Sequence, residues 1–425
     1  MMKIIKERNS EEPIYIVGAY LIRDDLLRVV LITDCRTNSK FYASFFDNQS
    51  MIVAAAKNLS AMLDGCLTNA CKYDGMYAEF EFPTKFVGDE VRLDIIDANN
   101  QSSLAMITVR RSVPPQQRKH RLAVCLPALF YYSDTVQLIE FIENWLLAGA
   151  TKFYVYWQAI TPAIKKKSGV DLELVAFPHL YNRTLDLLVY YTGQVISIND
   201  CLHKARSEAE FAAAVDLDEL LVTNSTNLTT LLSKTLPSWT GCYLSRMHAH
   251  FDKEPVYSSN AQQLRFDRLS EIHSEKIGSA FTKLILRPEN VYRSYVHWVN
   301  AADPPKRGIL RLCTFRPSEA MLVHLRSFKE NFNESKYEMS NILEKVSQNM
   351  AANWRLRLNV TDNKELLSLP ITRSIPDIAQ EMESCLLRLK GSAECFTASH
   401  CVPLLMTSTS TVVDWQYPEK EWIEM

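Results

Sequence analysis

The chain has 425 residues, of which 47% are hydrophobic, and its 47 Lys and Arg nearly balance its 49 Asp and Glu. This length predicts two or three domains with a large buried core, and the balanced charge argues against a protein that holds nucleic acid by electrostatics. The 11 Gly form no Gly-x-Gly pair, and the Rossmann fingerprint and the P-loop are both absent.

Residues 1–118 are predicted to form a β-rich domain. Short β-branched, aromatic or apolar runs at 14–17, 27–32, 40–46 and 104–109 are separated by polar turn clusters, which is typical of strands. Helical periodicity is weak there, apart from a possible segment around 52–63. The basic, proline-containing stretch 110–121 reads as a solvated linker at the end of this domain.

From Leu122 the pattern changes to alternating strands and helices. An apolar run at 122–132 predicts a buried strand, Asp134 sits at an N-cap position, and Gly149 closes the helix that follows. Further strands are predicted at 153–157, 172–177 and 212–215, with a helix over 195–208. This alternation predicts an α/β fold with a parallel or mixed sheet covered by helices.

Asp216 and Asp218 follow the fourth of these strands directly. Residues i and i+2 of a strand project to the same side, so both carboxylates are expected to face one cavity at the carboxyl edge of the sheet. Adjacent carboxylates repel unless a cation intervenes, and Mg²⁺ or Mn²⁺ is suited to bridge them to a diphosphate. The alternative is that the two aspartates lie in a solvent-exposed turn and bind no ligand. A phosphatase of the haloacid dehalogenase kind is disfavoured, because Leu220 and three preceding β units depart from its pattern.

A resemblance to glycosyltransferase family 92 extends over roughly residues 120–330. Its matches occur in order at 124–132, 138–154, 193–202, 214–222, 283–288, His297 and 323–326. The resemblance implies a GT-A fold, a Rossmann-like mixed sheet flanked by helices, for a catalytic domain at 119–345. Residues 346–425 would then be a C-terminal extension, in which 381–389 reads as a helix.

The resemblance also implies an activity, namely metal-dependent, inverting transfer of galactose or another hexose from a UDP-sugar to a glycan such as a fucosylated N-glycan. Mn²⁺, or else Mg²⁺, would be held by Asp216, Asp218 and His324, although the family tends to have Tyr where Leu325 follows that histidine. The alternative ligand is His297, which lies in an apolar run read as a strand at 295–299.

Other site residues follow from the same comparison. The donor would contact Tyr132, Asn199 and Asp200, for which helix capping is the alternative role of the last two. Inversion needs a carboxylate base, and three candidates lie between the metal motif and Lys283. These candidates, each of which is alternatively a surface charge, are Asp267, Glu271 and Glu275. A catalytically inactive, glycan-binding relative of the same fold is the alternative function.

Family resemblance predicts the Golgi lumen or membrane. No signal peptide or membrane helix is recognised in this chain, yet Asn-x-Ser/Thr sequons, which favour the secretory lumen, occur at Asn48, Asn58, Asn100, Asn182, Asn224, Asn227, Asn333 and Asn359. Ten Cys are too few for a disulfide scaffold. Cys66 and Cys71 are one candidate pair, and two of Cys385, Cys395 and Cys401 are another.

Overall fold

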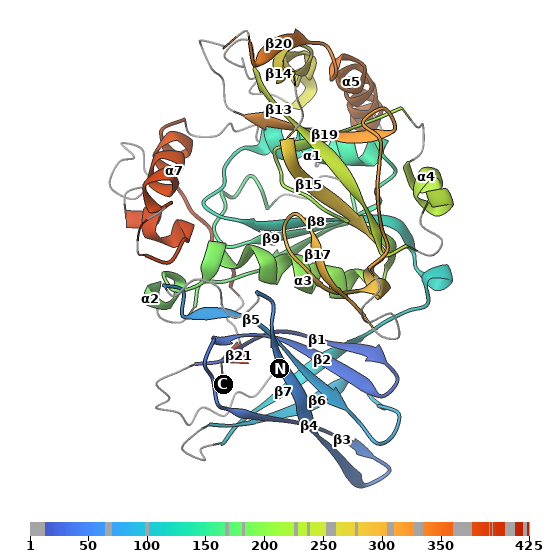
Figure 1. The fold of residues 1–425 in the computed structure, drawn as a ribbon, viewed down its shortest axis with the longest axis vertical. Coiled ribbons are helices and arrows are strands. Elements are labelled where there is room, and N and C mark those ends of the chain that lie inside the picture. Colours follow the sequence, from blue (N-terminus) through green and yellow to red (C-terminus); the bar gives the residue numbers. More distant parts are fainter. Residues whose placement is uncertain are drawn as a thin grey trace.

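The computed structural model describes most of the chain. The described residues are 13–63, 70–97, 102–165, 170–180, 183–224, 228–235, 239–251, 261–276, 279–303, 310–326, 333, 335–359, 376–390, 392, 394–403, 413–419 and 423–424. Figure 1 shows an α/β part above a β-rich part in which the N-terminal strands lie.

The N-terminal strands form a sheet that closes on itself, because β1 pairs with both β2 and β7. The strands are β1 (Tyr15–Arg23), β2 (Leu26–Asp34), β3 (Lys40–Asp47), β4 (Ser50–Ala61), β5 (Tyr73–Glu81), β6 (Glu90–Ile96) and β7 (Ser102–Arg111). Apolar side chains from these strands fill the interior, with Leu27, Phe80 and Leu93 fully buried. The predicted β-rich N-terminal part is therefore confirmed.

The prediction of a possible helix around 52–63 is wrong. These residues form most of β4, which pairs antiparallel with β3 and β5. Asn48 and Gln49 have positive φ angles of 43° and 76°, as a two-residue hairpin turn requires. Pairing on both sides of the strand therefore overrides the weak helical periodicity.

Only part of the basic stretch predicted as a linker, 110–121, lies outside the strands. Arg110 and Arg111 still belong to β7, and the 3₁₀ helix η1 (Pro115–Gln117) precedes β8, which starts at His120. The Arg118 side chain is only 1% exposed and lies 2.8 Å from Glu289, so this part of the linker is not solvated. Arginine can be buried here because its charge is paired.

The second sheet is mixed, and its parallel part runs in the order β10-β9-β8-β11. These strands are β8 (His120–Leu129), β9 (Lys152–Trp157), β10 (Leu172–Ala176) and β11 (Ala209–Ala214). The sheet continues through β15 (Ser279–Leu286), β13 (Gly241–Phe251), β14 (Ile272–Glu275) and β20 (Tyr337–Ser340). β19 (Ala320–Arg326) pairs with both β13 and β12 (Glu219–Thr223), while β18 (Leu312–Thr314) pairs with β13. The α/β prediction is confirmed, and the GT-A assignment remains a prediction.

The predicted helices α1 and α3 cover this sheet. α1 (Thr135–Leu147) starts at Asp134, whose side chain accepts from Gln137 N at 2.8 Å, and Gly149 has a φ of 94° just past its end. α3 (Gln194–Ala205) buries Ile196 and Leu202 in one core with residues of β2, β5, β8 and β11. In Figure 1 it lies between the two sheets. α3 thus joins the two parts of the molecule.

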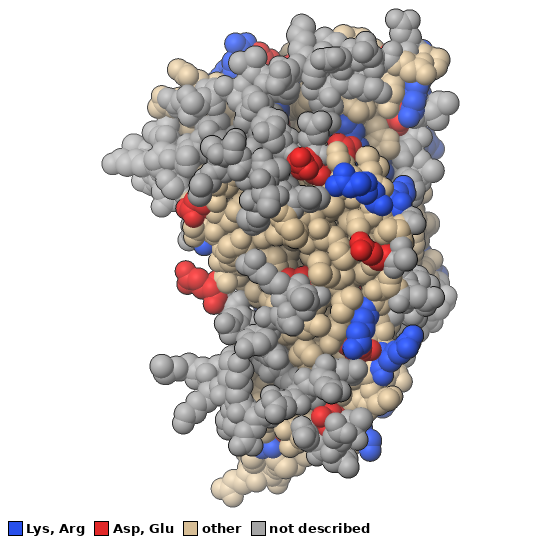
Figure 2. Space-filling view, turned by 90° about the vertical axis from the view of Figure 1, so that its left-hand side faces the viewer, with Lys and Arg blue, Asp and Glu red and all other residues tan. Residues whose placement is uncertain are grey.

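Shorter elements complete the described fold. They are α2 (Arg183–Asp186), η2 (Tyr190–Gly193), α4 (Leu228–Thr235), η3 (Ala261–Gln263), η4 (Asp267–Ser270), η5 (Pro288–Asn290), β16 (Val291–Ser294) and β17 (Val299–Ala302). β16 and β17 form a separate hairpin. Figure 2 shows acidic and basic side chains scattered over the described surface of one face, without a large patch of one sign.

The C-terminal region returns to both sheets. It contains α5 (Glu344–Asn359), α7 (Pro376–Leu389), η6 (Ala398–Cys401) and β21 (Ile423–Glu424), and β21 pairs with β1. The helix predicted at 381–389 is confirmed within α7. None of the described helices is long and apolar enough to cross a membrane.

Four disulfides are found among the described residues: Cys71–Cys395, Cys125–Cys201, Cys242–Cys313 and Cys385–Cys401. The predicted pairing within the C-terminal cysteines is confirmed. The Cys66–Cys71 pairing is wrong, because Cys71 bonds to a cysteine 324 residues further along the chain. Sequence proximity is a poor guide here, since the fold brings the C-terminal region back to β5.

Candidate active site

Asp216 lies just past the carboxyl end of β11 and is held by a lysine. Lys283 Nζ, on the neighbouring antiparallel strand β15, is 2.6 Å from Asp216 Oδ2, and Gln194 donates to Oδ1 at 3.2 Å. Burial opposes ionisation of Asp216, but the Lys283 charge outweighs it and lowers the carboxyl pKa. Burial disfavours the lysine charge in turn, yet Asp216 and Glu219 raise the pKa of Lys283. The pair is therefore charged at neutral pH.

Glu219 is completely buried beneath the turn that contains both aspartates. Its Oε2 accepts from the Asp216 backbone N–H at 2.9 Å, and Arg246 donates to its Oε1 at 3.2 Å. Burial raises the pKa of Glu219 to about 7, against the lowering effect of Lys283. Its hydrogen bond fixes the backbone from which Asp216 projects.

Asp218 is joined to the predicted histidine ligand. His324 Nε2 is 2.7 Å from Asp218 Oδ2, and Leu325 N donates to the Asp218 backbone oxygen at 2.8 Å. The contact arises because β19 pairs antiparallel with β12, with His324 opposite Glu219. Sequence positions 106 apart are thus brought into one site.

These side chains have the right chemistry for an oxygen-preferring divalent ion, since they offer two carboxylates and one imidazole. Asp216 is turned to Lys283 while Asp218 faces His324. Accordingly, no three His, Cys, Asp or Glu side chains in the described part of the chain are gathered as a metal-binding group. The donor set fits such an ion, and in this structure Asp216 is bonded to Lys283 and Gln194.

The alternative ligand His297 is near enough to Asp216 for the two charges to interact, but its ring bonds to another strand. Residues 295–298 form a bend between β16 and β17, so the strand read at 295–299 is wrong except for Val299. His297 Nδ1 is 2.8 Å from the Thr282 carbonyl oxygen, which this bend approaches. Burial lowers the pKa of His297. The structure does not place it with the Asp218–His324 pair.

The three candidate bases have different surroundings. Asp267 and Glu271 are exposed, and Asp267 pairs with Arg265 at 2.6 Å. Glu275 on β14 is buried, and its two oxygens lie 3.1 Å from His248 Nδ1 and 3.1 Å from Lys336 Nζ. Burial raises its pKa, but Lys336 and His248 outweigh burial and leave the pKa below its ordinary value. Glu275 is thus the candidate whose surroundings keep a buried carboxylate ionised.

Glu275 also has a route to the aspartate pair. The rings of His248 and His324 have centroids 5.1 Å apart, so the order of contacts is Glu275, His248, His324, Asp218. His248 and His324 meet because β13 and β19 are parallel neighbours with these residues in register. A single connected cluster therefore contains one candidate base and two candidate ligands.

The three predicted donor contacts lie in internal hydrogen bonds. Asn199 bonds to the Val195 and Ser294 backbones, while Asp200 accepts from the hydroxyls of Tyr20 and Tyr156. Tyr132 donates to the Asp134 carbonyl at 2.6 Å. The first two side chains tie α3 to its neighbours, and their role toward a donor stays a prediction.

The turn before α3 brings further residues to the site. Tyr191, Thr192 and Gly193 all have left-handed φ angles, of 48°, 54° and 74°. Such a conformation costs a non-glycine residue about 1–3 kcal/mol. The turn is held by the C-terminal region, since Tyr191 N donates to the Phe396 oxygen at 2.7 Å and Ala398 N to Thr192 Oγ1 at 3.1 Å. It carries Gln194 directly to Asp216.

Several residues of this cluster were not predicted as site residues. Gln194 and Lys283 lie within the matches to family 92 at 193–202 and 283–288, whereas Arg246 and His248 have no distinctive spacing. Lys283 and Gln194 contact Asp216, whereas Arg246 and His248 lie on β13, in the middle of the sheet. The signal available for Lys283 is that it is the one charged residue in the sequence of β15.

Comparison with known proteins agrees with the resemblance. The model of glycosyltransferase family 92 matches residues 120–358, which is more than half of the chain. A Caenorhabditis elegans protein named "Beta-1,4-galactosyltransferase galt-1" is 26% identical over 48% of this chain and 52% of its own length. Another from the same organism, "Glycosyltransferase family 92 protein F55C10.4", is 28% identical over 29% of this chain and 23% of its own. The chain thus matches about half or less of these relatives' lengths.

Proposed function

Because this chain belongs to glycosyltransferase family 92, we propose that it is a metal-dependent, inverting galactosyltransferase. Its donor would be UDP-galactose or another UDP-hexose, and its acceptor a glycan such as a fucosylated N-glycan. The relative named as a galactosyltransferase supports the choice of sugar. The observation that carries the proposal is the Asp218–His324 contact beside Asp216 at the carboxyl end of β11.

In this proposal Asp216, Asp218 and His324 hold Mn²⁺, with Mg²⁺ as the alternative. Bound there, the ion would supply positive charge that neutralises the diphosphate leaving group. Lys283, released from Asp216, is a second cation for the same phosphates. Glu219 keeps the aspartate turn in place through the Asp216 backbone.

The acceptor hydroxyl attacks the anomeric carbon from the face opposite the leaving group and loses its proton to a carboxylate. Of the three candidates, we favour Glu275, because Lys336 and His248 keep it ionised and it contacts the cluster through His248. Asp267 instead pairs with Arg265 at the surface, and Glu271 is exposed.

We also assign the protein to the Golgi lumen. Buried disulfides such as Cys125–Cys201 are typical of oxidising compartments. Among the described residues, the sequon asparagines Asn48, Asn58, Asn224, Asn333 and Asn359 are all exposed, as glycosylation requires. Localisation of the tagged protein, with and without removal of N-glycans, tests this assignment.

The deciding experiment is a thermal-shift titration with UDP, UDP-galactose and UDP-glucose, with and without Mn²⁺. A ligand that binds only the folded state stabilises it by about 2.7 kcal/mol at a hundredfold excess over Kd. The expected result is a Mn²⁺-dependent shift that is lost in Asp216→Asn and kept in Asp267→Asn, a matched change at an exposed carboxylate.

The competing function is a glycan-binding relative without catalysis. The observation that favours it is the engagement of Asp216 by Lys283, which leaves the three donors apart. That function predicts glycan binding without any nucleotide-induced shift, and binding that Asp216→Asn leaves unchanged.

A further inference from the structure

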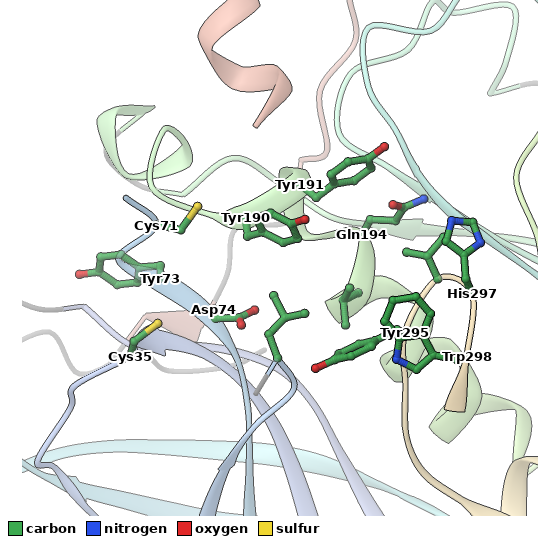
Figure 3. A pocket seen from close by; sticks show the side chains of 13 residues that line it. Cys35, Cys71, Tyr73, Asp74, Tyr190, Tyr191, Gln194, Tyr295, His297 and Trp298 are labelled. Carbon is green, nitrogen blue, oxygen red and sulfur yellow. The ribbon is translucent and has the colours of Figure 1, made fainter. Parts of the chain in front are cut away.

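A cavity of about 300 Å³ lies next to Asp216, which it reaches through Gln194, and the function proposed above assigns no role to it. Its walls come from β5, from the turn before α3 and from the bend at 295–298 (Figure 3). The volume is at the lower end of the ~300–1,000 Å³ of ligand-binding pockets. The cavity is therefore large enough for a small ligand and is shared by both parts of the molecule.

Asp74 has a buried carboxylate oxygen that a bound ligand could hydrogen-bond. The residue is 3% exposed, and its carboxyl group points toward the cavity interior in Figure 3. Oδ1 accepts from the Gly75 N–H at 2.7 Å, and the Leu63 backbone N–H also lies close enough to the carboxyl to lower its pKa, but Oδ2 is buried without a well-aligned donor among the described residues. A buried acceptor without a donor is costly, so a bound molecule with a hydroxyl would satisfy it.

The remaining walls are aromatic. Trp298 and Tyr191 are 47% and 45% exposed, and Tyr190 and Tyr295 lie deeper between them and Asp74. Tyr295 packs edge-on against Trp298, with ring centroids 5.3 Å apart. Flat apolar rings around a hydrogen-bond acceptor are complementary to a pyranose, which has an apolar C–H face and hydroxyl donors on its edge.

The cavity adjoins the site proposed for the metal. Gln194 lines it and also donates to Asp216 at 3.2 Å. Tyr191 is close enough to Asp216 that, besides burial, the aspartate charge raises the pKa of its hydroxyl. A sugar in the cavity would thus lie beside Asp216 and the proposed metal and diphosphate site.

We propose that this cavity is the subsite for the acceptor sugar, in which Asp74 accepts a hydrogen bond from a ring hydroxyl and Trp298 contacts the ring face. The inference rests on the proposed function, because it assigns the second substrate of the same reaction. The same chemistry would also fit the hexose of the donor, and the test separates the two sources.

The test uses the full chain and two independent readouts. Saturation-transfer NMR with methyl glycosides of fucose, galactose, mannose and N-acetylglucosamine reports sugar binding, and thermal shift with UDP, UDP-galactose and Mn²⁺ reports the donor site. Asp74→Asn keeps an oxygen for the Gly75 amide, and Trp298→Ala removes the indole. The controls are Asp34→Asn, another buried carboxyl outside the cavity lining, and Phe46→Ala, an exposed aromatic on β3.

We expect at least one glycoside to bind, with Kd raised about tenfold or more by Asp74→Asn and by Trp298→Ala but not by the controls, and with the UDP shift unchanged. If these two variants instead weaken UDP-galactose binding relative to UDP, the cavity holds the donor hexose and the acceptor assignment is overturned. No glycoside binding, or binding indifferent to both variants, also overturns it. If the unaltered chain shows no thermal shift with UDP, only the proposed function is contradicted, because sugar binding by NMR is measured without UDP.

Discussion

Lys283 Nζ lies 2.6 Å from Asp216 Oδ2, which joins two neighbouring antiparallel strands at the edge where the candidate site lies. The lysine is 1% exposed, and Glu219 Oε2 is 3.7 Å away from the same ammonium group. This buried cation therefore lies between two carboxylates, of which Glu219 also contacts Arg246. The same arrangement leaves a positive charge available when Asp216 changes partner.

Replacing Lys283 by Met should destabilise the fold, because Glu219 would keep its burial and lose its nearest cation besides Arg246. Breaking a buried pair on one side costs about 3–5 kcal/mol, and the partial exposure of Asp216 places the loss near the lower figure. Urea unfolding measures it. Lys57→Met, at a side chain that is 62% exposed, should change stability by no more than about 0.5 kcal/mol.

Glu275→Gln should lower kcat by roughly 10²–10⁴-fold if this carboxylate is the base, while donor KM changes little. Asp267→Asn and Glu271→Gln are the matched controls, since both carboxylates are exposed on the surface. Steady-state kinetics with UDP-galactose and a glycan acceptor distinguish the three. A large kcat loss in either control, with Glu275→Gln active, would move the base to that residue.

His324→Gln should abolish the Mn²⁺-dependent thermal shift with UDP, because Asp218 loses the neighbour that shares its proposed ion. His297→Gln should leave the shift in place, since His297 faces the Thr282 carbonyl. Titration with Mn²⁺ at fixed UDP compares the two variants. The reverse pattern would make His297 the ligand.

Asp74 should make stability depend on pH. Burial raises its pKa in the fold to about 7, against about 3.9 in the unfolded chain. The unfolded state therefore releases the proton first, and the contribution of Asp74 to stability, present below about pH 3.9, is lost as pH rises to 7. The titratable group placed beside it is Tyr190, whose pKa is raised by burial and by Asp74.

Asp74→Asn removes this titratable group, so its contribution to the pH dependence of stability disappears. The variant should gain stability over the unaltered chain progressively from pH 4 to 7, by a few kcal/mol in total, and by a constant amount above that. Urea unfolding at each pH measures the difference. A difference that is flat over this range would show that Asp74 is ionised in the fold throughout.

The Cys71–Cys395 disulfide holds the C-terminal segment that braces the left-handed turn at 191–193. Replacing both cysteines by Ser should cost about 2–5 kcal/mol of stability and raise KM, since Gln194 follows this turn. The control is the double replacement of Cys242 and Cys313, which join β13 to β18. It should lower stability and leave KM nearer its original value. Equal KM changes in both would argue against positioning by the turn.

Much of the local structure could be predicted from the sequence. The N-cap at Asp134, the glycine after α1 and the strand that ends before Asp216 follow from short-range rules of capping and burial. The strands β4, β5 and β6 cannot be found in this way, and the sequence of β4 instead suggests a helix. Their assignment depends on partners across the closed sheet rather than on their own residues.

Sequence alone determined which residue types are available to the site, namely an Asp-x-Asp turn after a buried strand and histidines and acids further along. Only the tertiary structure decided that Lys283 holds Asp216, that His324 faces Asp218 and that Asp74 opens into a cavity beside Gln194. The reason is that each of these contacts joins different strands or helices. Which distant side chains meet is set by strand order and register in the folded sheet, and no local pattern of residues encodes these.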